Sequence, residues 1–411
     1  MKNLSARKAS CVYKITDKDG KPVSNTEVKF NLKNHEFLFG CGAFDFTSYF
    51  MEKDETKKAF YKERMDKWLD VFNYGTLNFY WGLFEPAEGM PQTESRMNAA
   101  KYLKEHGATV KGHPLCWHTA CADWLLKYDN KTILEKQLSR IDREVSGFKG
   151  IIDMWDVINE VVIMPVFDRY DNAITRICKE LGQVGTVKAV FNEAYKNNPG
   201  ATLLINDFNL SEKYVDLIKK CLDEGVQISA IGLQSHQHQG YWGREKLEET
   251  LARFEPFGIP LHFTENTLVS GPLVPPEIVD LNDYAYKDGD STPELEERQK
   301  NEMEDMYRIV FEEHPLVKAF TTWDFTDGMW LNAPSGFLHA DNSEKPSYKM
   351  MKNLIHNEYH TSLSAKTDAN GFVELSGFKG TYDVEFSFGG KTVNATAKLS
   401  DDTKNTSIVI E

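Results

Sequence analysis

The sequence predicts an α/β protein: a (β/α)8 TIM barrel with a small β-sandwich accessory domain assembled from both chain ends. Eight strand-like runs, several of them apolar throughout, alternate with helical stretches in the middle of the chain. No glycine-rich phosphate-binding fingerprint follows any of these runs, which disfavours an open doubly wound sheet. Both chain ends instead alternate apolar and polar residues, as antiparallel strands do.

The two chain ends are similar to the halves of one immunoglobulin-like or prealbumin-like sandwich. Residues 10–31 alternate around a Lys-Asp-Gly-Lys-Pro turn, and residues 360–411 alternate between clusters of turn residues. A two-stranded hairpin is at best marginally stable alone, so we expect one discontinuous sandwich with the barrel inserted between its halves. The alternative is two independent appendages. The predicted boundaries are 1–34 and 359–411 for the sandwich and 35–358 for the barrel.

The barrel is predicted from strands with apolar interiors that are each followed by a helical stretch. The loop from residue 266 to residue 292 is long, and long loops after barrel strands usually shape a substrate cleft. The predicted strands are 37–40, 75–80, 109–117, 151–160, 202–208, 229–236, 261–265 and 318–325. The predicted helices include 54–72, 93–105, 131–146, 185–197, 211–223 and 293–313.

Charge and length exclude several classes of partner. At 411 residues the chain accommodates a barrel of roughly 250 residues and one small module. The net charge of −14 argues against nucleic acid or an anionic membrane as a partner and fits a neutral or cationic ligand. No apolar run approaches about 18 residues, so no transmembrane helix is expected.

The N-terminal residues and the cysteines indicate in which cellular compartment we expect the protein. Arg7, Lys8 and Ser10 interrupt the first residues, which therefore lack the apolar core of a signal peptide. With Met1 as the native start we expect a cytoplasmic protein, whereas a secreted protein whose leader has been removed would read identically. The six cysteines show no Cys-x-x-Cys spacing and lie mostly in apolar runs, which favours buried free thiols over disulfides or a zinc site.

Two carboxylates at predicted strand ends carry the strongest chemical signal. Asn159 and Glu160 end one apolar strand, and Glu265 ends a later one. Side chains at the C-terminal ends of barrel strands face the active site. Glycoside hydrolysis needs one carboxyl group that protonates the leaving oxygen and a second on the other side of the scissile bond. A lone strand-end Asn-Glu pair is more often a cap or a salt bridge, but the second glutamate favours catalysis.

Polar and aromatic residues also gather at other predicted strand ends. Tryptophan faces stack on sugar rings, while His, Asn and Gln side chains hydrogen-bond sugar hydroxyls. The segments are Gly112–His118, Asn206–Asn209, Gly232–His236 and Trp323–Trp330.

The order and spacing of these motifs resemble glycoside hydrolase family 10, whose best-known members are endo-β-1,4-xylanases, over about residues 36–356. The carrying motifs are Gly-His-Pro-Leu-Cys-Trp-His, Trp-Asp-Val-Ile-Asn-Glu, Asn-Asp-Phe-Asn, Gly-Leu-Gln-Ser-His, Thr-Glu and Trp-Asp-Phe-Thr-Asp-Gly-Met-Trp. The resemblance implies a retaining β-glycosidase that hydrolyses β-1,4-xylosidic bonds in xylan or xylo-oligosaccharides. It would act through a covalent glycosyl-enzyme intermediate and without a cofactor.

The same resemblance implies a role for each matching residue. Glu160 would be the acid/base, and Glu265 would be the nucleophile, oriented by His236. Asn159 would bind the 2-hydroxyl of the reacting sugar. The other expected substrate contacts are His113, Trp117, Gln234, Trp323 and Trp330, together with Asn78, Tyr80 and Trp81 after the second strand.

Two departures from the family pattern bear on the substrate. The family usually carries Glu-Asn-x-x-Lys-Trp after the second strand, whereas residues 76–81 read Thr-Leu-Asn-Phe-Tyr-Trp. The Glu and the Lys are absent, and Asn78 is displaced by one position. The family often places an acid two residues after the nucleophile, where this chain has Thr267. We therefore expect weaker support of His236, or support from elsewhere, and an altered choice of β-linked glycoside.

Two other classes of function fit parts of the sequence. His113, His118, His236 and His238 suggest a metal-dependent barrel hydrolase, but no metal-binding Lys or Asp pattern accompanies them. A non-catalytic sugar-binding protein would keep the scaffold, although the presence of both carboxylates disfavours it. We expect a carbohydrate partner, no nucleic acid, no membrane and no metal; endo or exo action and the oligomeric state stay open.

Overall fold

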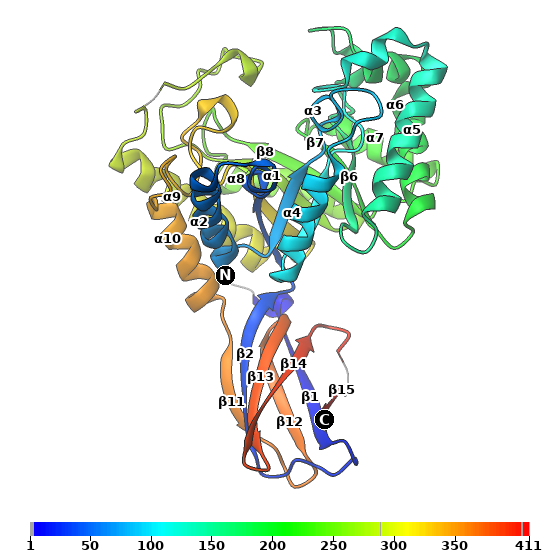
Figure 1. The fold of residues 1–411 in the computed structure, drawn as a ribbon. Helices are drawn as coiled ribbons and strands as arrows, with labels where there is room; N and C mark the ends of the chain where they lie inside the picture. Colours follow the sequence, from blue (N-terminus) through cyan, green and yellow to red (C-terminus); the bar gives the residue numbers. More distant parts are fainter. Residues whose placement is uncertain (1–3, 288, 404–405, 411) are drawn as a thin grey trace.

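The structure is a computed structural model that describes residues 4–287, 289–403 and 406–410. A closed barrel lies at one end of the molecule and a smaller β-structure projects from the other (Figure 1). This arrangement confirms the predicted fold class, because eight parallel strands alternate with helices and strands from both chain ends form the additional sheets.

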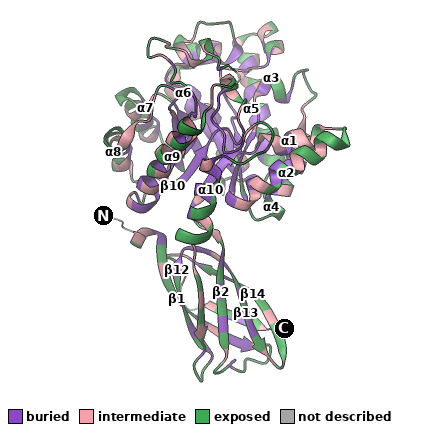
Figure 2. Cartoon of the chain, turned by 90° about the vertical axis from the view of Figure 1, so that its left-hand side faces the viewer, coloured by how far each residue is buried: buried purple, intermediate pink, exposed green. Residues whose placement is uncertain are grey.

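The barrel strands are hydrogen-bonded in the order β10-β3-β4-β5-β6-β7-β8-β9, and each neighbouring pair is parallel. Buried residues fill the barrel interior and the layer between strands and helices (Figure 2). The strands are β3 Leu38–Gly42, β4 Tyr74–Asn78, β5 Thr109–His113, β6 Met154–Asn159, β7 Thr202–Asp207, β8 Ala230–His236, β9 Leu261–Thr267 and β10 Val317–Thr322.

The helices surround this barrel, and several begin with a side-chain cap. Asp54, Asp129, Asn172, Ser211 and Thr292 each accept a hydrogen bond from a backbone amide in the first turn. The helices are α1 Phe44–Met51, α2 Glu55–Val71, α3 Trp81–Phe84, α4 Thr93–Glu105, α5 Asn130–Gly147, α6 Ala173–Asn197, α7 Glu212–Asp223, α8 Gly243–Phe254, α9 Pro293–Glu313 and α10 Pro346–Asn353.

Several predicted elements differ from the structure at their ends; for example, the strand predicted over 109–117 ends at His113. The run predicted as strand 75–80 ends at Asn78, because Tyr80 already caps the short helix α3. The helix predicted over 185–197 forms the second part of α6, whose first part begins at Ala173. Gly182, with φ 71° and ψ 166°, forms a kink inside this helix, so the glycines that looked like a helix boundary interrupt it only locally.

The smaller β-structure consists of two sheets, ordered β12-β1-β15 and β11-β2-β13-β14. The N-terminal strand β1 lies between β12 and β15, and β2 lies between β11 and β13. Neither sheet can form from one chain end alone, since each has an N-terminal strand among C-terminal ones. The strands are β1 Lys8–Asp17, β2 Glu27–His35, β11 Ser362–Lys366, β12 Phe372–Phe378, β13 Gly380–Phe388, β14 Lys391–Leu399 and β15 Thr406–Ile410.

A buried arginine connects the sheets to the barrel. The Arg7 guanidinium donates to the backbone carbonyls of Val310, Phe311 and His314 at the C-terminal end of α9. It also lies 4.7 Å from the ring centroid of Phe37. A cation that satisfies the free carbonyls of a helix end is favourable both as a hydrogen-bond donor and for the helix dipole.

Two further observations concern the helices and the cysteines. Within the described part of the chain, every helix is too short or too polar to cross a bilayer. All six cysteines are free, and only Cys121 is not fully buried.

Candidate active site

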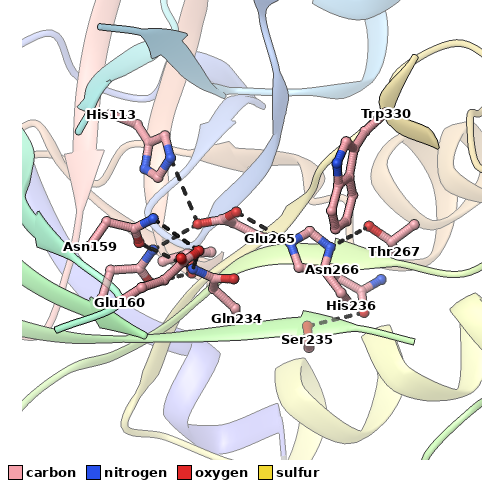
Figure 3. Close-up of polar contacts among 12 residues, drawn as sticks. His113, Asn159, Glu160, Gln234, Ser235, His236, Glu265, Asn266, Thr267 and Trp330 are labelled. Carbon is pink, nitrogen blue, oxygen red and sulfur yellow. Dashed lines mark hydrogen bonds and ion pairs between the residues drawn. The ribbon is translucent and has the colours of Figure 1, made fainter. Parts of the chain in front are cut away.

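The C-terminal ends of β6 and β9 bring Glu160 and Glu265 to the same face of the barrel (Figure 3). Glu160 follows the last residue of β6 and has a φ of 56°, a left-handed conformation that non-glycine residues adopt at a cost. Its backbone amide donates to the carbonyl of Asn206 at 2.8 Å, which holds this conformation in place.

Neutral donors surround the carboxyl group of Glu160. The Trp117 indole donates to Oε2 at 2.8 Å, and the side-chain amides of Gln234 and Asn159 donate to Oε1 at 3.2 Å and 3.3 Å. Burial, followed by the charge of Glu265, raises the pKa of Glu160 to about 8, against the partial opposition of these hydrogen bonds. Glu160 therefore keeps its proton at neutral pH.

The surroundings of Glu265 have the opposite electrostatic effect. Its Oε1 accepts a hydrogen bond from Asn206 at 2.7 Å, and its Oε2 lies 3.3 Å from Nε2 of His236. Nε2 of His113 lies 3.9 Å from Oε1. Burial alone would raise the pKa of Glu265, but His113, His236 and Lys111 together lower it below its ordinary value. Glu265 is therefore ionised at neutral pH.

Side-chain amides connect the two glutamates. The Nδ2 atom of Asn206 donates to Glu265 and also to Oδ1 of Asn159 at 2.8 Å, and Gln234 donates to the same Oδ1 at 3.1 Å. Thr264 fixes the amide orientation of Asn206, because its hydroxyl donates to Oδ1 of Asn206 at 2.6 Å. The network orients both carboxyl groups without adding a charge between them.

A buried ion pair lies beneath this layer. Nζ of Lys111 and Nδ1 of His113 each lie 2.7 Å from Oδ2 of Asp156. Both Lys111 and Asp156 are 0% exposed. Burial would raise the pKa of Asp156, but Lys111 and His113 lower it on balance, so the carboxylate stays charged and fixes the imidazole of His113.

Thr267 supports His236 from the neighbouring strand. Its Oγ1 lies 2.9 Å from Nδ1 of His236, while Nε2 of the same ring faces Glu265. The family pattern leads us to expect that His236 is supported more weakly, or by another residue. In the structure Thr267 itself supports His236, through a hydroxyl that carries no charge.

Four aromatic side chains predicted at the site lie around the two glutamates. The ring centroid of Tyr80 is 5.8 Å from that of His113 and 5.5 Å from that of Trp117. Trp323 is 5.2 Å from His113. Trp330 is 4.6 Å from His236 and lies beside it in Figure 3. All four provide apolar faces close to the polar network.

Of the remaining two predicted contacts, Trp81 lies apart from this cluster, whereas Asn78 lies next to it. Trp81 is buried, donates to Glu85 at 3.1 Å and packs edge-on against Trp124 at 5.8 Å. Asn78 ends β4 beside His113 in the sheet register, and its carbonyl accepts a hydrogen bond from Arg96 at 3.3 Å. The described contacts of Trp81 are those of a packing residue that supports α3.

Sequence reasoning missed three members of the network: Asn206, Lys111 and Asp156. Asn206 was recognised as part of a motif but was given no role. Lys111 and Asp156 each interrupt an otherwise apolar strand, and an ionisable residue in a buried strand requires a partner. That signal was available, although it could not identify the partner.

The four histidines that suggested a metal do not form one group, although the rings of His236 and His238 lie 5.9 Å apart. His113 and His236 face Glu265, whereas His118 packs 4.5 Å from Phe167 and His238 packs 5.1 Å from Trp330. In the ranges that the structure describes, no group of three or more His, Cys, Asp or Glu side chains is arranged to hold a metal ion.

Comparison with known proteins agrees with this geometry. Residues 46–354 match the family model described as Glycosyl hydrolase family 10. The anti-sigma-I factor RsgI6 of Acetivibrio thermocellus is 24% identical over 395 residues, covering 94% of this chain and 46% of that protein. An endo-1,4-beta-xylanase/feruloyl esterase of Xylanibacter ruminicola is 26% identical over 306 residues, covering 67% of this chain and 40% of that protein.

A solved structure of GH10 from Paenibacillus barcinonensis has a TM-score of 0.63 at 20% identity, covering 78% of this chain and 95% of that chain. An eight-stranded barrel with paired carboxyl groups at its strand ends is an architecture of glycoside hydrolases. The chain belongs to glycosyl hydrolase family 10, which confirms the resemblance in the sequence. It spans less than half the length of both relatives named above.

Proposed function

We propose that the chain is a retaining β-glycosidase that cuts β-1,4-xylosidic bonds in xylan or xylo-oligosaccharides. One observation carries the proposal: Glu160 and Glu265 lie at the ends of β6 and β9 in surroundings that protonate the first and ionise the second. A retaining glycosidase needs one carboxylic acid and one carboxylate on either side of the scissile bond.

In the first step the Glu265 carboxylate attacks the anomeric carbon. The bond from that carbon to the leaving oxygen breaks, and Glu160 transfers its proton to this oxygen. An ester forms between the sugar and Glu265. His236 and Asn206 contact different oxygens of Glu265, so they hold the carboxylate in a fixed orientation during the attack.

In the second step Glu160, now ionised, removes a proton from water. The resulting hydroxide attacks the anomeric carbon, the ester to Glu265 breaks, and the two inversions together give net retention. Glu160 regains its proton and Glu265 its charge. The raised pKa of Glu160 serves both steps, because a group that titrates near the working pH can donate and accept a proton.

The substrate class rests on the family and on neutral recognition groups. The relative from Xylanibacter ruminicola is named an endo-1,4-beta-xylanase/feruloyl esterase. In this proposal Asn159 binds the 2-hydroxyl of the reacting sugar, and His113, Gln234 and Trp323 surround that sugar. Tyr80 contributes a neutral phenol where the family usually has a lysine, which favours uncharged sugar groups at this position.

The experiment that tests the proposal is hydrolysis of 4-nitrophenyl β-xylobioside. We expect turnover by the unmodified chain and a loss of several orders of magnitude in the Glu265→Ala variant. Glu374→Gln, an exposed change on β12, is the matched control and should retain full activity. Equal rates in Glu265→Ala and the unmodified chain, or tight xylobiose binding without turnover, would refute the assignment.

We also propose a structural role for the accessory sandwich. Residues 1–34 with 359–411 form one unit and residues 35–358 the other in this proposal. Arg7 anchors the first unit to α9 of the second. Deleting residues 359–411 should therefore lower the melting temperature of the barrel more than it lowers kcat, whereas a large rise in KM at unchanged stability would indicate carbohydrate binding by the sandwich.

A further inference from the structure

A buried carboxyl group that has no role in the proposed reaction lies directly after Trp323. Asp324 is 1% exposed. Its Oδ2 accepts a hydrogen bond from the Ser335 hydroxyl at 2.6 Å, and this hydroxyl also lies 3.4 Å from the carbonyl oxygen of Ala333. Burial raises the pKa of the carboxyl group to about 7, against the opposing effects of Ser335 and of the nearby Trp330 backbone amide. Its Oδ1 is buried without a hydrogen-bond partner among the described residues. Such a group is costly to bury, which calls for a compensating function.

The segment that Asp324 contacts is strained. The turn formed by residues 328–333, here called the Trp330 turn, contains Leu331 with φ 61° and Asn332 with φ 54°. Neither residue is glycine, and two consecutive side chains in the left-handed region are unfavourable unless the surroundings enforce them. Gly328 closes the turn by donating its amide to the Ala333 carbonyl at 3.0 Å.

The Trp330 turn is also tied to the long loop after β9. The Tyr286 amide donates to the Leu331 carbonyl at 2.9 Å, and the Trp330 indole donates to Oδ1 of Asn282 at 3.2 Å. These bonds connect the turn to another loop, whereas Asp324 and Ser335 connect it to β10. Asp324 follows β10 by two residues, so its hydrogen bond with Ser335 links the chain after the turn to the end of this strand.

The turn places the Trp330 ring over two histidines. The ring lies 4.6 Å from that of His236, which contacts the nucleophile, and 5.1 Å from that of His238 (Figure 3 for His236). His238 is 0% exposed, and neither of its ring nitrogens has a hydrogen-bond partner in the described structure. An imidazole without partners stays buried only while its cover stays closed, so His238 reports the position of Trp330.

We propose that Asp324 is a positioning residue that, together with Ser335, holds the strained Trp330 turn closed and keeps Trp330 packed over His236 and His238. Without the hydrogen bond between Ser335 and Asp324 the turn relaxes toward ordinary backbone angles. Trp330 then moves away from the histidines, and water reaches His238. The effect of this movement on the sugar rests on the proposed function, because Trp330 is expected to form part of the sugar site; the effect on His238 does not.

The test uses solvent access to His238, which is measured in the full-length chain without substrate. Hydrogen–deuterium exchange at the imidazole C2 position of His238, followed by mass spectrometry, should be at least about tenfold faster in Asp324→Ala than in the unmodified chain. Asp324→Asn is the matched control, because its carbonyl oxygen still accepts from Ser335, and its exchange should stay within about twofold.

A second variant keeps the test decisive if Asp324→Ala fails to fold. Ser335→Ala removes the hydroxyl that donates to Asp324 but keeps the carboxyl group, and it should give an exchange rate between those of Asp324→Asn and Asp324→Ala. A folded Asp324→Ala or Ser335→Ala variant whose His238 exchanges at the original rate would overturn the proposal.

Kinetics separate this inference from the proposed function. With 4-nitrophenyl β-xylobioside, Asp324→Ala should raise KM several-fold more than it lowers kcat, while Asp324→Asn should leave both nearly unchanged. If the chain hydrolyses no xylobioside, the proposed function fails while the exchange result still decides the role of Asp324. If hydrolysis is normal and His238 exchange is unaffected, only the role of Asp324 fails.

Discussion

The two glutamates are both buried, yet their surroundings differ in charge. Around Glu160 the contacting groups are an indole and two amides, which are neutral, and the charged groups that act on it are carboxylates, first Glu265 and then Asp207. Around Glu265 stand two imidazoles, with Lys111 acting from beneath. Burial raises the pKa of both, so the sign of the nearby charge decides which one holds a proton.

The charged groups that distinguish the two glutamates lie beside Glu265 and beneath it, not among the amides that connect the two carboxyl groups. Asn206, Asn159 and Gln234 bond to the glutamates but contribute no net charge. The asymmetry comes from His113 and His236 beside Glu265 and from Lys111 beneath them, and the buried Lys111–Asp156 pair fixes His113 in this position. Substitutions around Glu160 and substitutions around Glu265 should therefore differ in their effects on activity, stability and pH dependence.

The largest expected effect separates the roles of the two glutamates by leaving group. Glu160→Ala should lower kcat/KM on xylobiosides of poor leaving groups by about 10²- to 10⁴-fold, because the leaving oxygen receives no proton. Glycosides of acidic phenols need little protonation and should form the glycosyl-enzyme almost normally. Glu265→Ala should instead lose activity on both substrates. Steady-state and pre-steady-state rates on paired aryl xylobiosides measure this, and equal losses on both substrates in Glu160→Ala would contradict it.

Breaking the buried ion pair should destabilise the fold. Lys111→Met leaves Asp156 as an uncompensated buried charge, which costs about 3–5 kcal/mol of unfolding free energy. Combining Lys111→Met with Asp156→Asn removes both charges and should recover a large part of that loss, because the introduced amide oxygen still accepts a hydrogen bond from His113. Urea denaturation of the single and double variants measures the recovery. A double variant no more stable than the single one would argue against the pairing.

The pH dependence should reflect the two opposite shifts. Glu160 must be protonated and its pKa is raised to about 8, so kcat/KM should fall above this pH by about tenfold per pH unit. Glu265 must be ionised and its pKa is lowered, so activity should persist to pH values below the ordinary glutamate range. A pH–rate profile measures both limbs; a decline that begins near about pH 5 would mean that Glu160 is an ordinary, unshifted carboxylate.

The smallest expected effect concerns Thr267. Thr267→Val removes the hydroxyl next to Nδ1 of His236 and, with it, about 1 kcal/mol of hydrogen bonding, which corresponds to roughly a fivefold loss in kcat/KM. Thr267→Ser retains the hydroxyl and serves as the control. An unchanged rate in the valine variant would indicate that Glu265 alone orients His236.

Much of the fold and part of the site were predictable. Regular hydrophobic patterns predicted the barrel and the paired chain ends because strand and helix periodicities are local. Glu160, Glu265 and His236 stood in motifs whose spacing matches a family. The geometry around them is non-local: neither the pairing of Lys111 with Asp156 nor the contact of Asp324 with the Trp330 turn can be read from sequence, since each joins residues from separate elements.

The second strand illustrates the limit. Its residues continue to alternate beyond Asn78, as those of a strand would. In the structure the chain turns into α3 after Asn78, and Trp81 packs against Trp124. A single tryptophan fits a sugar platform and a packed interior equally well in sequence, and only the direction of the backbone separates the two.

The stereochemistry of the first product tests the central account most directly. Proton NMR of 4-nitrophenyl β-xylobioside hydrolysis, recorded before mutarotation, distinguishes the two anomers of the released xylobiose. Attack by Glu265 followed by attack of water predicts the β-anomer as the first product. Initial release of the α-anomer would mean a single displacement by water and would contradict the role of Glu265 as nucleophile.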